Sequence, residues 1–374
     1  MAKKILIVYG TAGIGHKKAA TAVKKAYEEM KLDGVETMLI DSLDYTNPFF
    51  RWSYLQSYLL MVNKLPTFWG LSYYLTDIPF VDLFVSGLRR LNNWANSKKL
   101  YKLMQDMKPD VVISTHFFAS EVIADMKKKG NTAARLVTVI TDFRVHAWWV
   151  CEGTDYYVVA SEDVRRELEA RRIETSIIRV MGIPVEPAFA KQSDRRRIFE
   201  ATGLRDDKFT TLVIGGGFGV GPIEGIVKVI ASLKKDLQTV VVCGRNEELV
   251  KRIEALKREF NMNMKVTGFI DNVYEYMEVS DILISKSGGI TVSESLAKDI
   301  PMVIISPIIG QETANCNFLI NNKAAVKVDR LEDLKDALEG LLADPMKLES
   351  MKESIKRVRK PNAAYDVAKF AYEL

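Results

Sequence analysis

Short apolar runs alternate with amphipathic segments along most of the 374-residue chain. The apolar runs are nearly continuous in Val, Ile and Leu, which is typical of parallel strands covered by helices on both faces. In the N-terminal half we expect a helix at 17–30 and strands at 5–9, 36–40, 111–114, 136–140 and 156–160. The alternation starts again further on, with strands expected at 211–214, 239–243, 264–267, 282–285 and 302–305. The pattern predicts an α/β fold with two doubly wound domains.

The boundary between the predicted domains falls where the alternation is interrupted. Residues 181–192 contain two prolines and a glycine between apolar runs. Such residues mark loops and linkers, so we assign residues 1–185 to a first domain and 186–360 to a second. The segment 361–374 begins with a proline and reads as a separate helix. We expect that helix to pack back on the first domain.

Composition is that of a soluble globular protein, with 48% hydrophobic and 27% charged residues. Three scattered cysteines (Cys151, Cys243 and Cys316) have neither disulfide nor zinc spacing, which favours a reducing, cytoplasmic setting. The chain enters an apolar strand at once, so we expect no signal peptide. No apolar run approaches the length of a transmembrane helix. The net charge of +5 is mild, and no nucleic-acid signature accompanies it, so nucleic acid is not an expected partner.

Residues 45–102 break the alternation because aromatic and basic side chains gather there. Aromatic rings and cations together suit a membrane interface, where rings lie at headgroup level and cations meet anionic lipids. Trp52, Trp69, Arg89 and Arg90 are our candidates for contact with an anionic membrane surface. The alternative is a helical insertion whose aromatic residues pack on its own domain.

The loop at residues 10–16, Gly-Thr-Ala-Gly-Ile-Gly-His, follows the first strand and opens a helix. A dinucleotide-binding GxGxxG motif needs a third glycine, but Lys18 stands at that position. Asp41 could still serve as the ribose-binding acid of such a motif, so a dehydrogenase remains an alternative with little support. His16 is the unusual element of this loop. At a helix start the dipole disfavours imidazolium, which keeps the neutral ring available as a base near neutral pH.

The three histidines, His16, His116 and His146, each follow an apolar run of the first domain. Carboxyl ends of strands are where open α/β sheets form their sites. His116 and His146 have helix capping or core hydrogen bonding as an equal alternative. Asp142 is a candidate for orienting a histidine or an acceptor hydroxyl, and otherwise an N-cap. A zinc site made by the three histidines is conceivable, but their spacing does not support it.

In the second domain glycine-dense loops follow two predicted strands. The loop at 215–222 would let backbone approach a diphosphate closely, and the turn at 286–291 places backbone N–H groups at a helix start. Together they predict a sugar-nucleotide site. Glu294 could accept ribose hydroxyls or be a first-turn Glu favoured by the dipole, and Gln311 and Glu312 could bind sugar hydroxyls or belong to a solvated loop.

These segments resemble glycosyltransferase family 28, in the branch of monogalactosyldiacylglycerol synthases and processive diacylglycerol glucosyltransferases. The resemblance covers nearly the whole chain and rests on five motifs: GIGHKKAA, TDFRVHAWW, GGGFGVGP, KSGGITVSESLA and PIIGQETANCNFL. It implies a GT-B fold of two facing Rossmann-like domains, in which the final helix returns to the first domain. It also implies inverting transfer of a hexose from a UDP-sugar to diacylglycerol, without a bound metal or other cofactor, by a peripheral protein at the cytoplasmic face of the cell membrane.

The resemblance also implies roles for individual residues. His16 would be the base on the lipid hydroxyl, and Glu294 would hold the ribose. Gln311 and Glu312 would hold the transferred sugar, and Phe269 would lie near the uracil. The diphosphate would be lined by Gly217, Gly219, Gly288, Gly289 and Thr291. Apart from the resemblance, their positions after predicted strands make Gly15, His116, Asp142 and His146 our candidates for the acceptor side.

Two positions depart from the family pattern. Ser287 stands where proline is usual, and Phe218 stands where an acidic or small residue is frequent. Glucose is the expected sugar, because the chain resembles the bacterial branch. The alternatives are an N-acetylglucosamine transferase acting on a lipid-linked peptidoglycan precursor, a UDP-N-acetylglucosamine 2-epimerase, and a non-catalytic membrane-associated UDP-sugar sensor.

Overall fold

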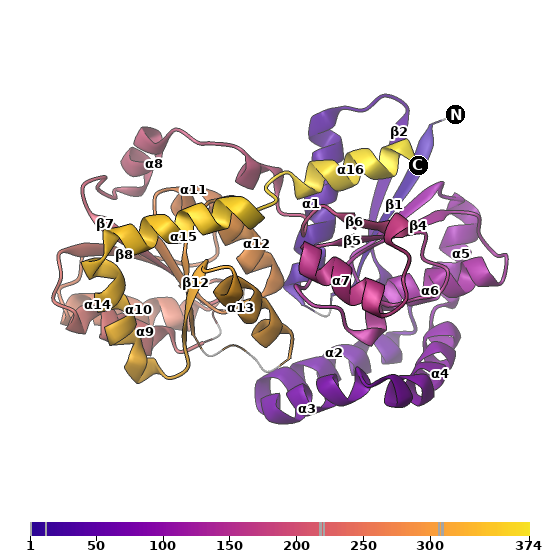
Figure 1. Ribbon diagram of the computed structural model, residues 1–374, viewed down its shortest axis with the longest axis horizontal. Coiled ribbons are helices and arrows are strands. Elements are labelled where there is room, and N and C mark those ends of the chain that lie inside the picture. Colours follow the sequence, from indigo (N-terminus) through magenta and orange to yellow (C-terminus); the bar gives the residue numbers. More distant parts are fainter. Residues whose placement is uncertain (1, 12, 217–218, 220, 306, 308–309) are drawn as a thin grey trace. The chain divides into compact units, whose positions relative to one another are not determined.

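The computed structural model describes residues 2–374 except 12, 217, 218, 220, 306, 308 and 309. The chain forms two compact units. The first comprises residues 1–187, 308–314 and 362–374, and the second comprises residues 188–307 and 315–361. Each unit is built around one six-stranded sheet in which all pairs of strands are parallel. The predicted α/β class with two doubly wound sheets is therefore confirmed (Figure 1).

The sheet of the first unit has the strand order β2-β1-β3-β4-β5-β6. Alternate residues of its strands pack on opposite faces: Leu6 and Val8 on one, Ile5 and Ile7 on the other. Buried residues run on through the strands because helices cover both faces. The strands are β1 (Lys3–Tyr9), β2 (Val35–Asp41), β3 (Val111–Ser114), β4 (Arg135–Val139), β5 (Tyr156–Val159) and β6 (Ile178–Val180).

The helices of the first unit divide between the two faces of its sheet. α5 (Lys98–Met107) and α6 (Phe117–Lys128) contribute to the core on the face of Leu6. α1 (Ile14–Met30) and the C-terminal α16 (Ala363–Glu373) contribute to the core on the face of Ile5. α16 lies beside α1 (Figure 1), and the Tyr27 hydroxyl donates to the Ala368 carbonyl at 2.6 Å. α7 (Glu162–Ala170) follows β5.

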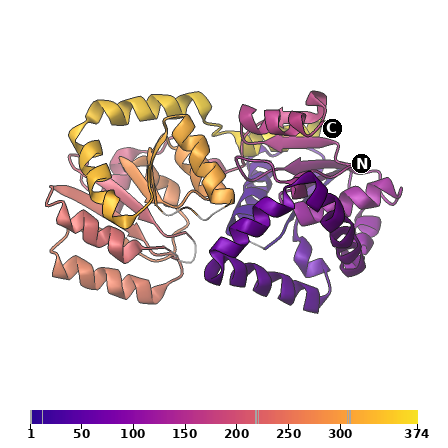
Figure 2. The ribbon, with the colours of Figure 1, turned by 60° about the horizontal axis from the view of Figure 1, so that its bottom comes forward.

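Three consecutive helices form the aromatic insertion between β2 and α5: α2 (Pro48–Lys64), α3 (Pro66–Thr76) and α4 (Pro79–Asn96). Each begins with a proline in its first turn, where the missing N–H is tolerated and the fixed φ suits a helix. The prolines therefore explain why this stretch is three helices and not one. Figure 2 shows them together at one side of the first unit.

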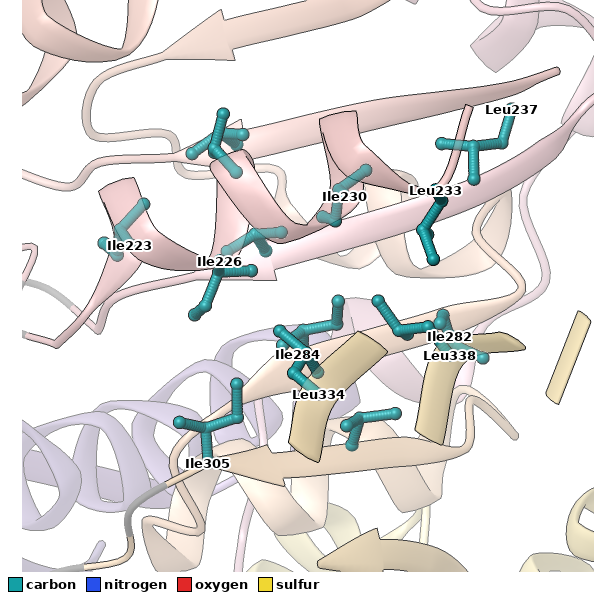
Figure 3. Packing of buried hydrophobic residues seen from close by; sticks show 14 of the residues in the cluster. Ile223, Ile226, Ile230, Leu233, Leu237, Ile282, Ile284, Ile305, Leu334 and Leu338 are labelled. Atoms are coloured by element: carbon teal, nitrogen blue, oxygen red, sulfur yellow. The ribbon is translucent and has the colours of Figure 1, made fainter. Parts of the chain in front are cut away.

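The sheet of the second unit has the order β12-β11-β10-β7-β8-β9. Ile223, Ile226 and Ile230 lie along one side of α9 and pack with strand residues such as Ile282 and Ile284 (Figure 3). The strands are β7 (Phe209–Ile214), β8 (Leu237–Val242), β9 (Met264–Thr267), β10 (Ile282–Ser285), β11 (Met302–Ile305) and β12 (Ala325–Val328). The helices are α8 (Arg195–Thr202), α9 (Ile223–Ser232), α10 (Glu247–Glu259), α11 (Val273–Glu278), α12 (Gly289–Ala297), α14 (Leu334–Ala343) and α15 (Pro345–Val358). Of α13 (Gln311–Asn321), the residues from Asn315 onward belong to this unit.

Each sheet reverses its direction of growth once. In the first unit the chain moves from β1 outward to β2 and then returns to place β3 on the other side of β1. In the second unit it moves from β7 to β8 and β9 and returns to place β10 on the other side of β7. Loops that follow the two strands at such a switch diverge and leave a crevice, where open α/β sheets bind ligands. The fold thus specifies one ligand-binding edge in each unit.

Two strands escaped the sequence analysis, and both lie at sheet edges. β6 has three residues and β12 has four, and each carries a cation, Arg179 or Lys327, among its apolar residues. Short half-polar edge strands have too little hydrophobic pattern to be distinguished from loops. Among the helices in the described part of the chain, none is long and apolar enough to cross a membrane.

Candidate functional site

A cavity of about 480 Å³ lies at the switch edge of the first unit. His16 reaches it from the first turn of α1, which follows β1, and His116 reaches it from the N-cap position of α6, which follows β3. The two strands are neighbours in the sheet, so the topology brings together histidines 100 positions apart. Their ring centroids are 4.6 Å apart in an edge-to-face arrangement. Aromatic side chains form much of the remaining wall: Phe50, Tyr54, Phe117 and Trp148.

The hydrogen bonds of His16 fix its tautomer. Nδ1 lies 2.7 Å from the Thr115 carbonyl oxygen and 3.0 Å from the Thr141 hydroxyl. A carbonyl can only accept, so Nδ1 carries the proton and donates it to Thr115. Nε2 of the neutral ring is therefore an unprotonated acceptor. The Thr115 hydroxyl also donates to the His16 carbonyl at 2.9 Å, which ties the first turn of α1 to the end of β3.

Burial is the main cause of the low pKa of His16. Removal of the ring from water lowers its pKa from 6.5 to about 4, against a smaller upward effect of the hydrogen bond to Thr115. The sequence analysis expected a neutral imidazole and attributed it to the dipole of α1. The structure gives desolvation as the dominant reason. His16 is neutral at physiological pH, as a general base must be before it accepts a proton.

His116 caps α6, and His146 caps the single helical turn at Ala147–Trp149. Nδ1 of His116 accepts from the Phe118 backbone N–H at 3.2 Å, and Nδ1 of His146 accepts from the Trp148 backbone N–H at the same distance. Nε2 of His146 also donates to the Tyr73 carbonyl at 2.8 Å. Both histidines are buried. Burial lowers the pKa of His146 to about 4 and lowers that of His116 well below its usual range.

Gly10, directly after β1, gives the His116 ring its space. A Cβ atom at Gly10 would lie 2.9 Å from both Cγ and Nδ1 of His116, which is closer than real Cβ contacts. The ring also stacks on Phe117, with centroids 4.3 Å apart. The glycine that resembled a phosphate-loop residue in the sequence thus has a packing reason to be glycine.

The Asp41 carboxylate, the candidate ribose-binding acid, forms hydrogen bonds within the unit. It accepts from the Leu43 N–H at 3.0 Å and from the Thr11 hydroxyl.

Arg89 is turned into the unit, whereas the sequence analysis assigned it to the membrane surface. Its Nε lies 3.2 Å from each carboxylate oxygen of the buried Glu121. Asn93 donates to the same carboxylate at 2.6 Å, and the Arg89 guanidinium lies over the Trp148 ring at 5.9 Å. Glu121 belongs to α6, so these bonds fasten the insertion to the sheet. Arg90 remains more exposed, 3.7 Å from Glu121.

Asp77, at the end of α3, fastens the other side of the insertion. Its carboxylate pairs with Arg144 at 2.9 Å and Arg171 at 2.7 Å, and it accepts from the Ala147 N–H at 2.9 Å. These bonds hold the segment that carries His146 and Trp148 against α3. This role of Asp77 could not be predicted from local sequence patterns, because its partners lie more than 60 positions away.

The other residues predicted for the acceptor side are spread over the first unit. Gly15 lies in the first turn of α1, and Asp142 is buried beyond the end of β4. Trp69 is half-buried, with its ring centroid 6.5 Å from that of Trp148. Trp52 is exposed on α2. The structure therefore brings His16 and His116 together at the cavity, with Trp69, Arg89 and Gln311 also in its wall, and leaves Trp52 at the surface.

In the second unit the glycine loop follows β7 at the switch edge. Gly219 has φ of 63°, and a Cβ there would lie 2.3 Å from the Cys243 carbonyl oxygen, so only glycine fits. The loop therefore passes directly against the end of β8. Gly221, further along, lies near the Lys286 side chain, with 3.7 Å between its Cβ position and Lys286 Cε. The predicted ligand residue Gly217 lies outside the described residues, as does Phe218.

The second switch loop follows β10 and leads into α12. Gly288 is the N-cap residue and provides no side chain, so backbone N–H groups of the first turn face outward, as at many anion sites. Gly289 and Thr291 belong to that turn. Ser287 is buried, and its carbonyl accepts from the Asn315 side chain of α13 at 3.0 Å. Asn315, which the sequence analysis did not single out, thereby fixes this turn.

The remaining donor candidates lie near the same edge of the second sheet or at the start of α13. Phe269, after β9, is 51% exposed, and the Arg245 guanidinium lies 5.2 Å from its ring centroid. Glu294 is buried in α12. Gln311 and Glu312 begin α13. No group of three or more metal-ligating side chains occurs among the described residues, and the three histidines form no such group.

Comparisons with known proteins agree with this description. Residues 16–185 match the family described as monogalactosyldiacylglycerol (MGDG) synthase, and residues 194–358 match the family described as glycosyl transferases group 1. The fold is similar to that of Acinetobacter baumannii MurG, with a TM-score of 0.65 and 15% identity over 100% of both chains. It is also similar to Staphylococcus aureus MnaA in a co-structure with UDP, with a TM-score of 0.61 and 15% identity over 99% of this chain and 96% of that one.

Fold and sequence together define the class as a glycosyltransferase of GT-B type. The processive diacylglycerol beta-glucosyltransferase of Bacillus pumilus is 32% identical over 95% of this chain and 90% of its own length. That of Bacillus subtilis is 30% identical over 97% of this chain and 93% of its own. The chain belongs to this family, and the resemblance inferred from the five motifs is confirmed.

Proposed function

We propose that the protein transfers glucose from UDP-glucose to the free hydroxyl of diacylglycerol, with inversion at the anomeric carbon. The relatives are named for diacylglycerol and for a beta-glucosyl product. UDP-glucose is α-linked, so a β product requires inversion. The observation that carries the proposal is the geometry of His16, which lines an aromatic cavity at the switch edge and whose Nε2 is unprotonated because Nδ1 donates to Thr115. A lipid alcohol fits an apolar cavity that holds a base.

In the proposed mechanism His16 is the general base. The diacylglycerol oxygen attacks C1 of glucose while the bond from C1 to the diphosphate oxygen breaks and UDP leaves with the bonding electrons. The hydroxyl proton passes to Nε2 of His16. Nδ1 keeps its own proton on the Thr115 carbonyl, which holds the ring plane during the transfer. The imidazolium formed in this way loses its proton when the product leaves.

The second unit is proposed to bind the donor. Negative charge that develops on the diphosphate would meet backbone N–H groups of the glycine loop and of the first turn of α12, the preorganised dipoles that stabilise such charge. Gly217, Gly219, Gly288, Gly289 and Thr291 are the proposed diphosphate residues. Glu294 would accept from the ribose hydroxyls, Gln311 and Glu312 would bind the glucose, and Phe269 would lie against the uracil. We expect this arrangement to work without a metal, so activity should survive EDTA.

The insertion is proposed to contact an anionic membrane surface. In its helix α4 the usual burial of apolar and polar side chains is reversed at four positions. The polar Ser86 and Asn93 are buried, while Leu88 and Leu91 are 63% and 61% exposed. Of the 18 exposed large hydrophobic residues among those described, 13 lie between positions 49 and 94. Such a surface is unfavourable in water and is typical of a lipid interface. We therefore propose that the protein is a peripheral enzyme at the cytoplasmic face of the membrane.

The test uses purified protein, anionic vesicles that contain diacylglycerol, and UDP-glucose, UDP-galactose or UDP-N-acetylglucosamine in separate reactions. Proton NMR of the extracted lipid gives the coupling constant of the anomeric proton. We expect a β-linked hexosyl lipid with UDP-glucose as the preferred donor. An α-linked product would overturn inversion. A preference for UDP-N-acetylglucosamine would overturn the hexose assignment, and absence of a lipid product with all three donors would overturn the proposed function.

A further inference from the structure

Two histidines of the first unit have the same local structure but different surroundings. His116 and His146 each use Nδ1 to cap the backbone N–H two residues later. A backbone N–H can only donate, so Nδ1 carries no proton in either ring and Nε2 does. Nε2–H of His146 is satisfied by the Tyr73 carbonyl. Nε2–H of His116 is buried and has no hydrogen-bond partner among the residues that the structure describes.

The unsatisfied donor of His116 is held in place. Gly10 lies against one part of the ring, the Phe117 ring stacks on it, and the His16 ring meets it edge to face. The ring also cannot flip without loss of the bond to Phe118. A buried donor without an acceptor costs free energy, and such groups in native proteins mark strain or a missing ligand. The His116 ring therefore holds an unsatisfied, covered N–H close to the ring of the base.

Trp148 supplies a second donor of the same kind. Its indole Nε1 is buried and likewise lacks a hydrogen-bond partner in the described part of the chain. Its ring centroid is 5.1 Å from that of Phe117 and 4.5 Å from that of His146, which restricts its rotation. Indole N–H can only donate. Both donors belong to residues of the His16 cavity, so a ligand there should bring at least two acceptor oxygens.

We propose that these two N–H groups bind the oxygens of the acceptor lipid. His116 Nε2–H donates to the hydroxyl oxygen whose proton passes to His16, and Trp148 Nε1–H donates to the carbonyl oxygen of an acyl ester. The inference rests on the proposed function and adds the chemical class that the cavity selects: an alcohol that carries an ester carbonyl, in preference to an ether lipid. Both nitrogens are covered in this structure, so a small rotation of the neighbouring rings accompanies entry of the lipid.

The first test compares diacylglycerol with a dialkylglycerol of the same chain length, which keeps the hydroxyl but has no ester carbonyl. The wild-type protein should prefer the ester by about tenfold in kcat/KM, because the ether leaves the indole N–H unpaired. Trp148→Phe should lose most of that preference. Trp52→Phe, an exposed tryptophan outside the cavity wall, should keep it whatever its effect on overall rate. Equal use of the two lipids by the wild type would overturn the role of Trp148.

The second test separates the cap of His116 from its donor. In His116→Asn the amide oxygen lies near the position of Nδ1 and can still cap the Phe118 N–H. In His116→Gln an amide N–H lies near the position of Nε2 and replaces the donor. His116→Asn should raise KM for diacylglycerol about tenfold with KM for UDP-glucose unchanged, and His116→Gln should stay closer to the wild type. Rescue by Asn but not by Gln would show that only the cap matters and would overturn the role of His116.

The two tests also separate this inference from the proposed function. If the wild type forms no glycolipid from diacylglycerol, the proposed function has failed. If it forms glycolipid but the variants change neither the ester preference nor KM for diacylglycerol, the function stands and the two donors serve only packing.

Discussion

At the scale of single residues, the site depends on which nitrogen of each histidine carries a proton. His16 donates from Nδ1 to Thr115 and keeps Nε2 unprotonated, whereas His116 accepts at Nδ1 and carries its proton on Nε2. The two rings therefore offer an acceptor and a donor at one cavity. Backbone partners, not charged side chains, set both tautomers. The half-buried His16 and the buried His116 therefore lie edge to face as neutral rings.

The sequence predicts part of this arrangement. His16 and His116 could be found because histidine is rare in this chain and both follow apolar strands. Thr115, Gly10 and Trp148 could not be assigned, because their roles depend on neighbours from other elements. Arg89 was predicted at the membrane surface for the same reason, since its partner Glu121 is a tertiary contact.

Replacement of His16 tests the base directly. His16→Ala should lower kcat by about 10²–10⁴-fold, the usual range for general-base catalysis, because no other group would take the hydroxyl proton. Affinity for UDP, measured by calorimetry, should stay near the wild-type value. Lys17→Ala, at the exposed neighbouring position, is the matched control. Wild-type turnover in His16→Ala would remove His16 from the mechanism.

At the scale of elements, loops after neighbouring strands form the candidate sites. The sequence identified ten of the strands from their apolar runs, and with them the loops that carry the glycine motifs. It did not reveal the short edge strands β6 and β12, whose polar positions hide the pattern. It found an aromatic insertion but not its orientation. That α4 buries asparagine and exposes leucine follows from its tertiary partner Glu121, which no local pattern contains.

The glycine loop after β7 offers a matched pair of substitutions. Gly216 and Gly219 both have positive φ, of 69° and 63°, but a Cβ at Gly216 meets nothing within 4 Å. Gly219→Ala should force the loop away from the Cys243 carbonyl and weaken UDP binding by about tenfold or more. Gly216→Ala carries similar backbone strain without the clash and should have a smaller effect. Calorimetric titration with UDP measures both. Equal affinity of the two variants would show that the close approach at Gly219 does not shape the site.

The insertion should provide much of the affinity for membranes. Trp52 and Phe80 are 60% and 83% exposed on α2 and α4, so their replacement by serine should leave the fold intact. The double variant should sediment with anionic vesicles at least about tenfold less well, since burial of one aromatic side chain contributes about 1.5–3 kcal/mol. Met346→Ser, at a 78% exposed position of the second unit, is the control. Unchanged sedimentation of the double variant would contradict the interfacial role.

At the scale of the whole molecule, two sheets of the same doubly wound plan each contribute one switch edge. The division into units needs no special linker sequence, because each sheet buries its own apolar strands on both faces. The C-terminal α16 returns to α1 through a patch of small residues, Ala364, Ala368 and Ala371, that allows close packing. The proline that precedes this helix allows its start to be predicted from the sequence. Its contact with Tyr27 could not be predicted in this way.

Stability of the folded chain should depend on the buried histidines. Burial lowers the pKa of His16 and of His146 to about 4, and it lowers that of His116 well below its usual range. The unfolded chain therefore binds more protons than the folded chain between about pH 4 and 6.5, so stability is greatest above 6.5 and falls as pH decreases through that window. Burial raises the pKa of Glu167 and of Asp299, and these two groups act with the opposite sign to the three histidines.

Urea unfolding at pH 7 and pH 5 measures this dependence, because ordinary carboxylates stay largely ionised in that range. The midpoint should be clearly lower at pH 5. His146→Asn, which can keep the cap but cannot take up a proton, should reduce the difference. Identical midpoints for the wild type at the two pH values would contradict the lowered pKa values.

The central claim is that the His16 cavity accepts diacylglycerol and that the chain glycosylates it. The most direct measurement is mass spectrometry of the lipid phase after the purified protein has acted on vesicles that contain both diacylglycerol and a lipid-linked peptidoglycan precursor, with UDP-glucose and UDP-N-acetylglucosamine present. We expect hexosyl-diacylglycerol as the new lipid. An N-acetylhexosamine on the precursor, or no new lipid from a protein that binds UDP, would contradict it.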